Sequence, residues 1–133
     1  MSATGEQGFT LLEILVTLAI FGLIAGIGYP AVTRMIDHAQ FARAVAQTGT
    51  SLRMARALAI KSGTPVRFAL GNDAHWLASG RVLGDALPHG VGAVIDPGLM
   101  TFYADGSAQP GEVRLSDGHE TWSARIDANG LIS

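Results

Sequence analysis

The residue with the clearest chemical potential is a single carboxylate, Glu13, near the start of a long apolar run. Between positions 9 and 29 the chain is hydrophobic or small, and Glu13 is the only charged side chain there. A helix of this length spans about 31 Å at roughly 1.5 Å per residue, enough to cross a bilayer core. A charge inside such a segment costs about 2.5–3.5 kcal/mol, so we expect it to be functional and paired. The alternative is a carboxylate at a helix end that only reaches the lipid headgroups.

The other side chains capable of chemistry are scattered, and we expect no enzyme, metal site or cofactor. Serines and aspartates are plentiful, but no triad or nucleophile-elbow spacing is present. The Gly90-Val91-Gly92 stretch is expected to be a loop, since no helix is predicted to follow it and complete a phosphate cradle. Asp96, Asp105 and Asp117 are acidic residues expected in loops that could bind calcium, but turn formation of the Asp-Gly kind is the preferred interpretation. The four histidines lack the spacing of zinc ligands: His38, His75, His89 and His119.

Charge is distributed unevenly along the 133 residues, whose formal net charge is −2. The basic residues between positions 34 and 62 outnumber Asp37, the one acidic residue there. From residue 63 onward the acidic residues outnumber the basic ones. Nucleic-acid binding by this part is not expected, because phosphate contacts need clustered Lys and Arg. The chain has no cysteine, which excludes disulfides and leaves the compartment open.

The apolar run is too long for a cleavable secretory signal peptide, whose apolar region has about 7–15 residues. No cleavage site of the small-x-small type, followed by polar residues, lies after the run. The first eight residues contain Glu6 but no Lys or Arg, so the positive-inside rule gives weak guidance. Arg34 on the far side favours, if anything, the opposite topology. The residues alone therefore predict one spanning or signal-anchor helix of open orientation.

The start of this run resembles the class III signal of type IV pilins and type II secretion pseudopilins, in the stretch Gly8-Phe9-Thr10-Leu11-Leu12-Glu13. The resemblance implies that a prepilin peptidase cuts after Gly8 on the cytoplasmic side and N-methylates Phe9. It also implies that Glu13 pairs with the new N-terminal ammonium of a neighbouring subunit in a fibre. Such pairing would place two charges, each costly to bury alone, beside one another. It would also favour a single register between the helices of neighbouring subunits.

The helix is expected to run over residues 9–61 and to stop near residues 62–65, where Gly63 is followed by Pro65. Pro30 removes a backbone donor, so a kink is expected near residues 26–30. By the same resemblance, Gly22 and Pro30 mark the part that loosens when the helix packs in a fibre. The alternative is that both residue types are simply commoner in membrane helices.

Beyond Pro30, apolar residues recur at three-to-four spacing and predict a small apolar face that packs on a sheet. The expected face comprises Val32, Met35, Ile36, Ala39, Ala42, Val45, Ala46, Gly49, Leu52, Ala55, Leu58 and Ala59.

From Pro65 onward, strand and turn signals replace helical ones. Strands are expected at 66–70, 76–78, 99–104, 113–116 and 121–127, separated by turns rich in Gly, Asn and Asp. Trp76 and Trp122 are expected to pack in the core or on a sheet face. The predicted fold class is α+β and pilin-like. A long N-terminal helix, with a transmembrane half and then an amphipathic half, packs on a small C-terminal antiparallel β domain.

Two further regions narrow the resemblance to minor pseudopilins of the general secretion protein H and FimT group. They are the helix-to-strand junction at 52–66, and residues 102–107 together with 126–131. The implied organisation is a leader at 1–8, a transmembrane polymerisation helix at 9–29, an amphipathic helix at 30–62 and a periplasmic head at 63–133. The implied location is the bacterial inner membrane, crossed once.

The function implied by the resemblance is that of a minor pseudopilin of a type II secretion system, near the tip of the pseudopilus that helps to export folded proteins. The implied partners are major and minor pseudopilins of the tip complex, the prepilin peptidase, the inner-membrane assembly platform and membrane lipid. The alternative is a FimT-like minor type IV pilin for pilus assembly or DNA uptake. Its expected basic C-terminal motif is absent from the final residues 129–133.

Overall fold

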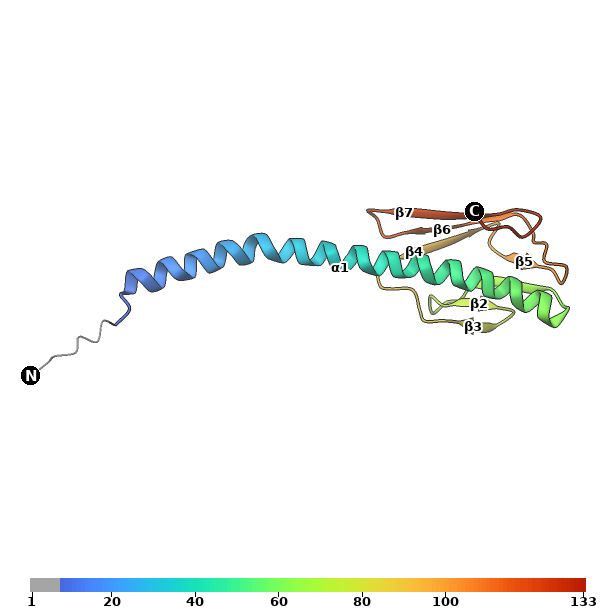
Figure 1. Cartoon of the computed structure of the whole chain (residues 1–133), viewed down its shortest axis with the longest axis horizontal. Coiled ribbons are helices and arrows are strands. Elements are labelled where there is room, and N and C mark those ends of the chain that lie inside the picture. The colour runs from blue at the N-terminus through green and yellow to red at the C-terminus, as the bar shows by residue number, and fades with distance from the viewer. Residues whose placement is uncertain (1–7) are drawn as a thin grey trace, which may run out of the picture. The chain divides into compact units, whose positions relative to one another are not determined.

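The computed structural model describes residues 8–133, and the rest of the expected leader lies outside this range. Within it, one helix, α1 (Leu11–Ser62), precedes seven strands (Figure 1). The chain divides into two compact units. The first ends at His38 and contains the N-terminal part of α1, and the second is Ala39–Ser133.

Helix α1 begins and ends where its caps are satisfied. Thr10 caps the start, so the helix begins two residues later than expected. At the other end Gly63 adopts a φ of 66° and donates its amide to the Ala59 carbonyl at 3.0 Å. A left-handed glycine of this kind closes a helix. The helix is continuous through Pro30, and the kink expected there stays a prediction.

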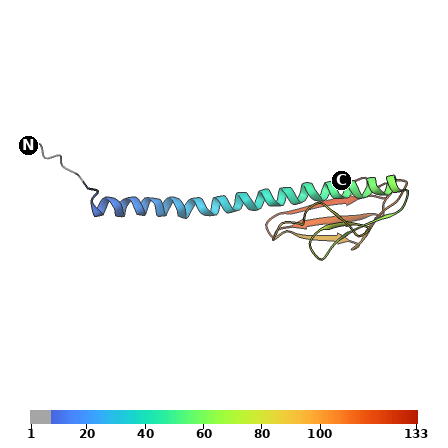
Figure 2. The same cartoon turned by 90° about the horizontal axis from the view of Figure 1, so that it is seen from below.

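The second unit holds two antiparallel sheets. The four-stranded sheet has the order β3-β2-β1-β5, and the three-stranded sheet has the order β4-β6-β7. Figures 1 and 2 show the C-terminal part of α1 lying along one side of both sheets. The strands are β1 (Val66–Leu70), β2 (Trp76–Ala78), β3 (Arg81–Leu83), β4 (Gly92–Asp96), β5 (Met100–Phe102), β6 (Gly111–Ser116) and β7 (Thr121–Ile126).

The α+β fold class is confirmed, and all five predicted strands are present, with β1 and β2 at the predicted bounds. The sequence patterns missed β3 and β4. Strand β3 is only three residues long and pairs with β2 through a tight turn in which Ser79 and Gly80 have φ of 48° and 84°. Two positive φ values match the twist of a two-residue hairpin. Strand β4 begins at Gly92, so the loop expected at residues 90–92 ends one residue earlier.

The predicted apolar face of α1 was partly wrong. Gly49, Leu52, Ala55 and Ala59 are buried as expected, but the predicted residues from Val32 to Ala42, together with Ala46, are exposed. The buried face instead includes Phe41, Ala44, Thr48 and Ser51. The hydropathy pattern missed this face because it contains two hydroxyl side chains.

A polar contact at the centre of the core explains one of these hydroxyls. Trp76 is fully buried and stacks on Phe68, with ring centroids 5.0 Å apart. Its indole Nε1 donates to Thr48 Oγ1 at 3.0 Å, and that hydroxyl donates to the Ala44 carbonyl at 2.8 Å. A buried indole N–H needs such an acceptor, so Thr48 fixes the tryptophan against the helix. The expectation that Trp76 packs in the core is confirmed.

Candidate functional site

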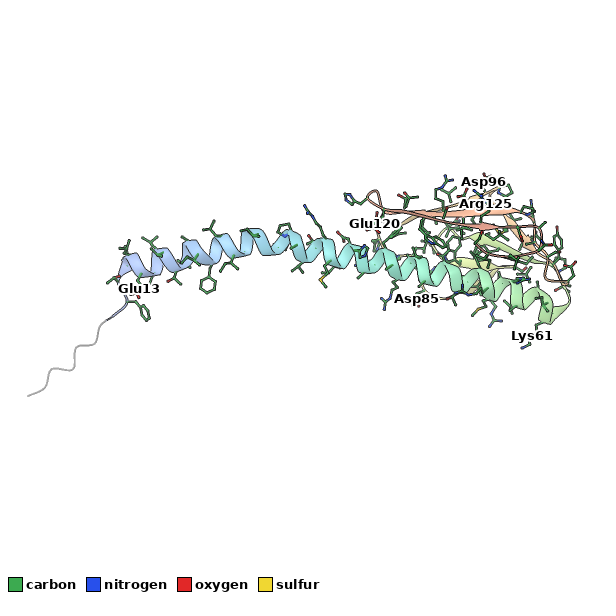
Figure 3. All side chains as sticks on the ribbon, turned by 45° about the horizontal axis from the view of Figure 1, so that its top comes forward. Glu13, Lys61, Asp85, Asp96, Glu120 and Arg125 are labelled. Carbon is green, nitrogen blue, oxygen red and sulfur yellow. The ribbon has the colours of Figure 1, made fainter. Side chains whose placement is uncertain are left out.

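Three of the predicted site residues, Gly8, Phe9 and Glu13, lie at the start of α1. Gly8 and Phe9 precede the helix in non-helical backbone, and Phe9 is 79% exposed. Glu13 follows in the first turn, where Figure 3 labels it. The prepilin-like motif therefore straddles the boundary between non-helical backbone and helix.

Thr10 sets that boundary as the helix cap. The Glu13 amide donates to Thr10 Oγ1 at 3.3 Å and to the Thr10 carbonyl at 3.0 Å, and the Ile14 amide donates to the same carbonyl at 3.2 Å. A threonine followed by glutamate at the third helical position is the signature of a capping box. The sequence contains this signal, although no role was predicted for Thr10.

The carboxylate of Glu13 has no hydrogen-bond or ion-pair partner anywhere in residues 8–133. It lies at the end of the helix where the backbone amides carry partial positive charge, which stabilises an anion. Its apolar neighbours Phe9, Leu11 and Leu12 are each at least 70% exposed. The arrangement offers one fixed anion, set among apolar surface, to a cation from another molecule.

Gly22 and Pro30 lie farther along the same helix, away from this cluster. A Cβ atom added at Gly22 would meet nothing within 4 Å, so packing inside the unit does not require a glycine there. The Pro30 carbonyl accepts a hydrogen bond from Thr33 Oγ1 at 3.1 Å. By length and composition, α1 can cross a membrane.

Of the three aspartates weighed as calcium ligands, Asp105 and Asp117 serve in turns, whereas Asp96 is the last residue of β4 and not a loop residue as expected. Hydrogen bonds from the Ser107 hydroxyl and amide hold the pKa of Asp105 below its ordinary value. The amides of Glu120 and His119 lower the pKa of Asp117 in the same way. Among the residues from Gly8 to Ser133, no cluster of three or more His, Asp or Glu side chains could hold a metal ion.

Arg56 is a structural residue that the sequence patterns did not single out. Its Nε donates to the Gly106 carbonyl at 2.9 Å, and its Nη2 donates to the Asn129 carbonyl at 3.2 Å. One side chain of α1 thereby ties down two turns that are far apart in the sequence. The sequence predicted only the turns themselves, at Asp105-Gly106 and Asn129-Gly130, and not their contact with Arg56.

Both regions of the chain match known families. Residues 4–29, which contain the capped motif, match the prokaryotic N-terminal methylation motif. Residues 44–131, which form most of the second unit, match the family of the type II transport protein GspH. The chain belongs to the GspH family. The resemblance to this group in the sequence is thus confirmed.

A curated GspH relative is the type II secretion system protein H of Xanthomonas campestris pv. campestris. It is 31% identical over 136 residues, an alignment that covers 94% of this chain and 79% of the relative. Among solved structures, the minor type IV pilin FimU of Pseudomonas aeruginosa has a TM-score of 0.58 at 17% identity, covering 73% of this chain and 89% of FimU. This likeness shows the pilin-like fold. The minor pseudopilin EpsH of Vibrio cholerae has a TM-score of 0.45 at 16% identity, covering 67% of this chain and 92% of EpsH.

GspH membership makes this chain a minor pseudopilin of a type II secretion system, which confirms the function predicted from the sequence. The family is a structural component of the system and works with other pseudopilins. The apolar helix, with the methylation motif at its start, indicates anchoring in the inner membrane with the head in the periplasm. The alternative role as a FimT-like pilin is not favoured.

Proposed function

We propose that the capped start of α1 is the assembly element of this minor pseudopilin. The prepilin peptidase cuts the bond between Gly8 and Phe9 and methylates the new amine of Phe9. Glu13 then pairs with the N-terminal ammonium of the neighbouring subunit as the helix enters the pseudopilus. The observation that carries this proposal is the Glu13 carboxylate, which lies in an apolar first turn whose backbone Thr10 caps and which has no partner in residues 8–133.

The energetic argument rests on the apolar surroundings. An unpaired carboxylate in a membrane helix is costly, and pairing it with an ammonium that is also hard to bury alone offsets part of both desolvation penalties. Because the pair forms only when two helices are in one register, it selects correctly placed subunits. The methylation-motif match over residues 4–29 supports both processing and methylation at this position.

The remaining details of the proposal concern topology and position. Residues 9–29 cross the inner membrane once, residues 30–62 continue as the periplasmic part of the helix, and residues 63–133 form the sheets of the head. The subunit sits near the tip of the pseudopilus and contacts the inner-membrane assembly platform during insertion. Gly22 and Pro30 allow this helix to loosen locally when it packs beside its neighbours, and Gly22 has room for a side chain in the isolated unit.

The experiment compares two substitutions in cells that contain the complete secretion system. Gly8→Ala should leave the precursor uncut, which intact-mass analysis detects as retention of the first eight residues. Glu13→Ala should be cut and methylated normally but should be lost from sheared pseudopilus fractions, because the neighbour's ammonium has no anion to meet.

The matched control is Glu13→Asp, which keeps the charge and should retain partial incorporation. Normal processing of Gly8→Ala would refute the cleavage site. Normal incorporation of Glu13→Ala would refute the pairing, whatever the outcome for Gly8.

A further inference from the structure

The exposed apolar surface of the first unit continues past the end of the predicted membrane segment. Tyr29 is 76% exposed, and the three large side chains that follow it are 57%, 76% and 50% exposed: Val32, Met35 and Ile36. They extend the uncovered apolar surface as far as residue 36, over about 10 Å of helix. We define residues 29–36 as the interfacial segment. A continuous apolar surface of this kind marks contact with another protein or with a membrane.

Arg34 is the one charged side chain inside the interfacial segment. It is exposed, and no hydrogen bond or ion pair joins it to another residue in the range 8–133. Asp37, the next charged residue along the helix, forms no ion pair with it. A cation on the head side of the membrane also runs against the positive-inside rule. The position of Arg34 therefore calls for an anion from outside the chain.

The spacing along the helix matches the layers of a bilayer. The hydrocarbon core is about 30 Å thick, and the headgroups add about 5–7 Å on each side. With residues 9–29 in the core, Tyr29 lies at its edge and Arg34 lies about 7.5 Å further out. Because Cα–Cβ bonds in a helix tilt toward its N-terminus, the Arg34 side chain starts back toward the lipid phosphates. Asp37 lies about 12 Å beyond Tyr29, outside the headgroup layer.

The distribution of side chains around the helix favours lipid over a protein that docks on one face. By helical spacing, Tyr29, Val32 and Ile36 share one side, whereas Arg34 lies on the opposite side. A segment that exposes apolar groups on one side and a cation on the other suits a medium that surrounds it. The Thr33 hydroxyl donates to the Pro30 carbonyl at 3.1 Å, so this polar group is satisfied within the helix. Tyrosine is itself enriched at membrane edges, where its ring faces acyl chains and its hydroxyl reaches water.

We propose that the interfacial segment lies in the headgroup layer on the head side of the inner membrane, where the Arg34 guanidinium binds a phospholipid phosphate. Tyr29, Val32 and Ile36 contact the adjoining acyl chains. Arginine can bind a phosphate through two parallel N–H donors, which fixes its depth better than a point charge does. This Arg34 anchor sets how deep the helix sits and so holds Glu13 inside the core before assembly. The inference rests on the proposed function for the direction in which the helix crosses.

The first test measures the contact between Arg34 and phosphate. The full chain, isotope-labelled at the guanidinium carbons of its arginines, is placed in vesicles of phosphatidylethanolamine and phosphatidylglycerol. Carbon–phosphorus recoupling in solid-state NMR detects guanidinium carbons within about 5 Å of a lipid phosphorus. We expect a recoupled arginine signal that Arg34→Gln removes. The matched control is Arg53→Gln, which replaces an exposed arginine of α1 in the second unit and should leave that signal unchanged.

The second test measures the depth of the segment. Because the chain has no cysteine, single ones can be introduced by Ile36→Cys and Gln40→Cys, both at exposed positions of α1. In vesicles whose heads face outward, an impermeant maleimide should react about tenfold more slowly at position 36 than at position 40. Each rate is divided by that of the unfolded chain. Arg34→Glu should remove most of this protection, because phosphates repel a carboxylate, whereas Arg34→Lys should retain it.

Three outcomes would overturn the Arg34 anchor: no recoupled signal from Arg34, equal losses for Arg34→Gln and Arg53→Gln, or equal rates at positions 36 and 40. The vesicles contain no peptidase and no other pseudopilin, so these results are independent of the assembly element. If Glu13→Ala enters filaments normally while the Arg34 contact is present, the assembly element fails and the anchor stands. If the contact is missing while Gly8→Ala and Glu13→Ala behave as proposed, only the anchor fails.

Discussion

The two parts of α1 are equally helical but differ in where they find their contacts. Up to His38, the large apolar side chains are exposed, among them Leu18 at 63% and Phe21 at 64%. From Phe41 onward, one face of the same helix is buried against two sheets. Apart from Glu13, residues 9–29 of the first part carry no charged side chain, which is typical of a helix that crosses a membrane, whereas the second part is buried only on the side that its own sheets cover.

Two threonines show the same difference at the level of single hydrogen bonds. Thr17 Oγ1 donates to the Glu13 carbonyl at 2.7 Å, and Thr48 Oγ1 donates to the Ala44 carbonyl at 2.8 Å. The geometry is alike, but Thr17 is exposed while Thr48 is buried and also accepts from Trp76. A hydrogen bond of one type is therefore local in the first part, whereas in the second part the same hydroxyl also joins the helix to a distant strand.

The largest expected contrast comes from the aromatic residues. Trp76→Ala should lower the free energy of unfolding of the second unit by about 3–5 kcal/mol, because a large buried side chain leaves a cavity. Phe21→Ala in the first part should leave that free energy unchanged. Denaturant unfolding of the full chain in detergent, followed by the fluorescence of Trp122, measures both. Equal effects would contradict the division of the helix.

Glycines provide the next contrast. Gly130 has a φ of 73°, and a Cβ atom there would lie 2.2 Å from the Gly106 carbonyl oxygen and 2.9 Å from Arg56 Nε. Gly130→Ala should therefore cost about 1–3 kcal/mol in the stability of the second unit. Gly22→Ala meets no atom within 4 Å and should not lower the thermal midpoint of that unit. A stable Gly130→Ala variant would show that the two turns held by Arg56 can separate freely.

The threonine pair gives a somewhat smaller contrast. Thr48→Val should cost about 1–2 kcal/mol, because the buried Trp76 indole N–H loses its acceptor. Thr17→Val removes a hydroxyl of the same kind from an exposed position and should change the unfolding free energy of the second unit very little. The same denaturant titration checks both. A neutral Thr48→Val variant would mean that Trp76 does not depend on this acceptor.

The smallest effect is expected from Asp105 and acts through pH. Its pKa is lowered from the ordinary 3.8 by hydrogen bonds from Ser107, so the folded state favours the charged form. The associated stability is present above pH 3.8 and is lost as the pH falls through the lower pKa of the folded state. Asp105→Asn should flatten the pH dependence of unfolding in this acid range. Ser107→Ala, which removes the hydroxyl donor, should act in the same direction, and unchanged acid profiles would contradict the assignment.

The sequence predicted the elements of the second unit best where characteristic turn residues marked their ends. Pairs such as Asp105-Gly106 and Asn129-Gly130 delimited strands, and the Ser62 to Pro65 junction marked the helix end to within a residue. The short β3 was missed because its pairing is set by the conformation of Ser79 and Gly80 and not by alternating hydropathy. Burial of Thr48 was missed because its hydroxyl bonds the Trp76 indole, a contact between distant positions that no local pattern contains.

The candidate site was easier to predict from the sequence than the second unit, because Gly8, Phe9 and Glu13 lie within six consecutive positions. The motif around Gly8, Phe9 and Glu13 needs no tertiary contact to be recognised, and the structure added the role of Thr10 as cap. The exposed arginines in the second part of α1 are the opposite case. Arg43 and Arg53 were visible in the sequence, but the two grooves that they line exist only because β3 and the C-terminal turn lie beside the helix.

The cap at Thr10 also has a consequence for the enzyme that would process the chain. A helix that began one turn earlier would wind the bond between Gly8 and Phe9 into its hydrogen-bonded backbone, where a peptidase cannot straighten it. By fixing the start at Leu11, Thr10 keeps that bond in open backbone next to the apolar segment. One hydroxyl group thus sets where the helix begins, and that boundary lies two residues after the bond proposed for cleavage.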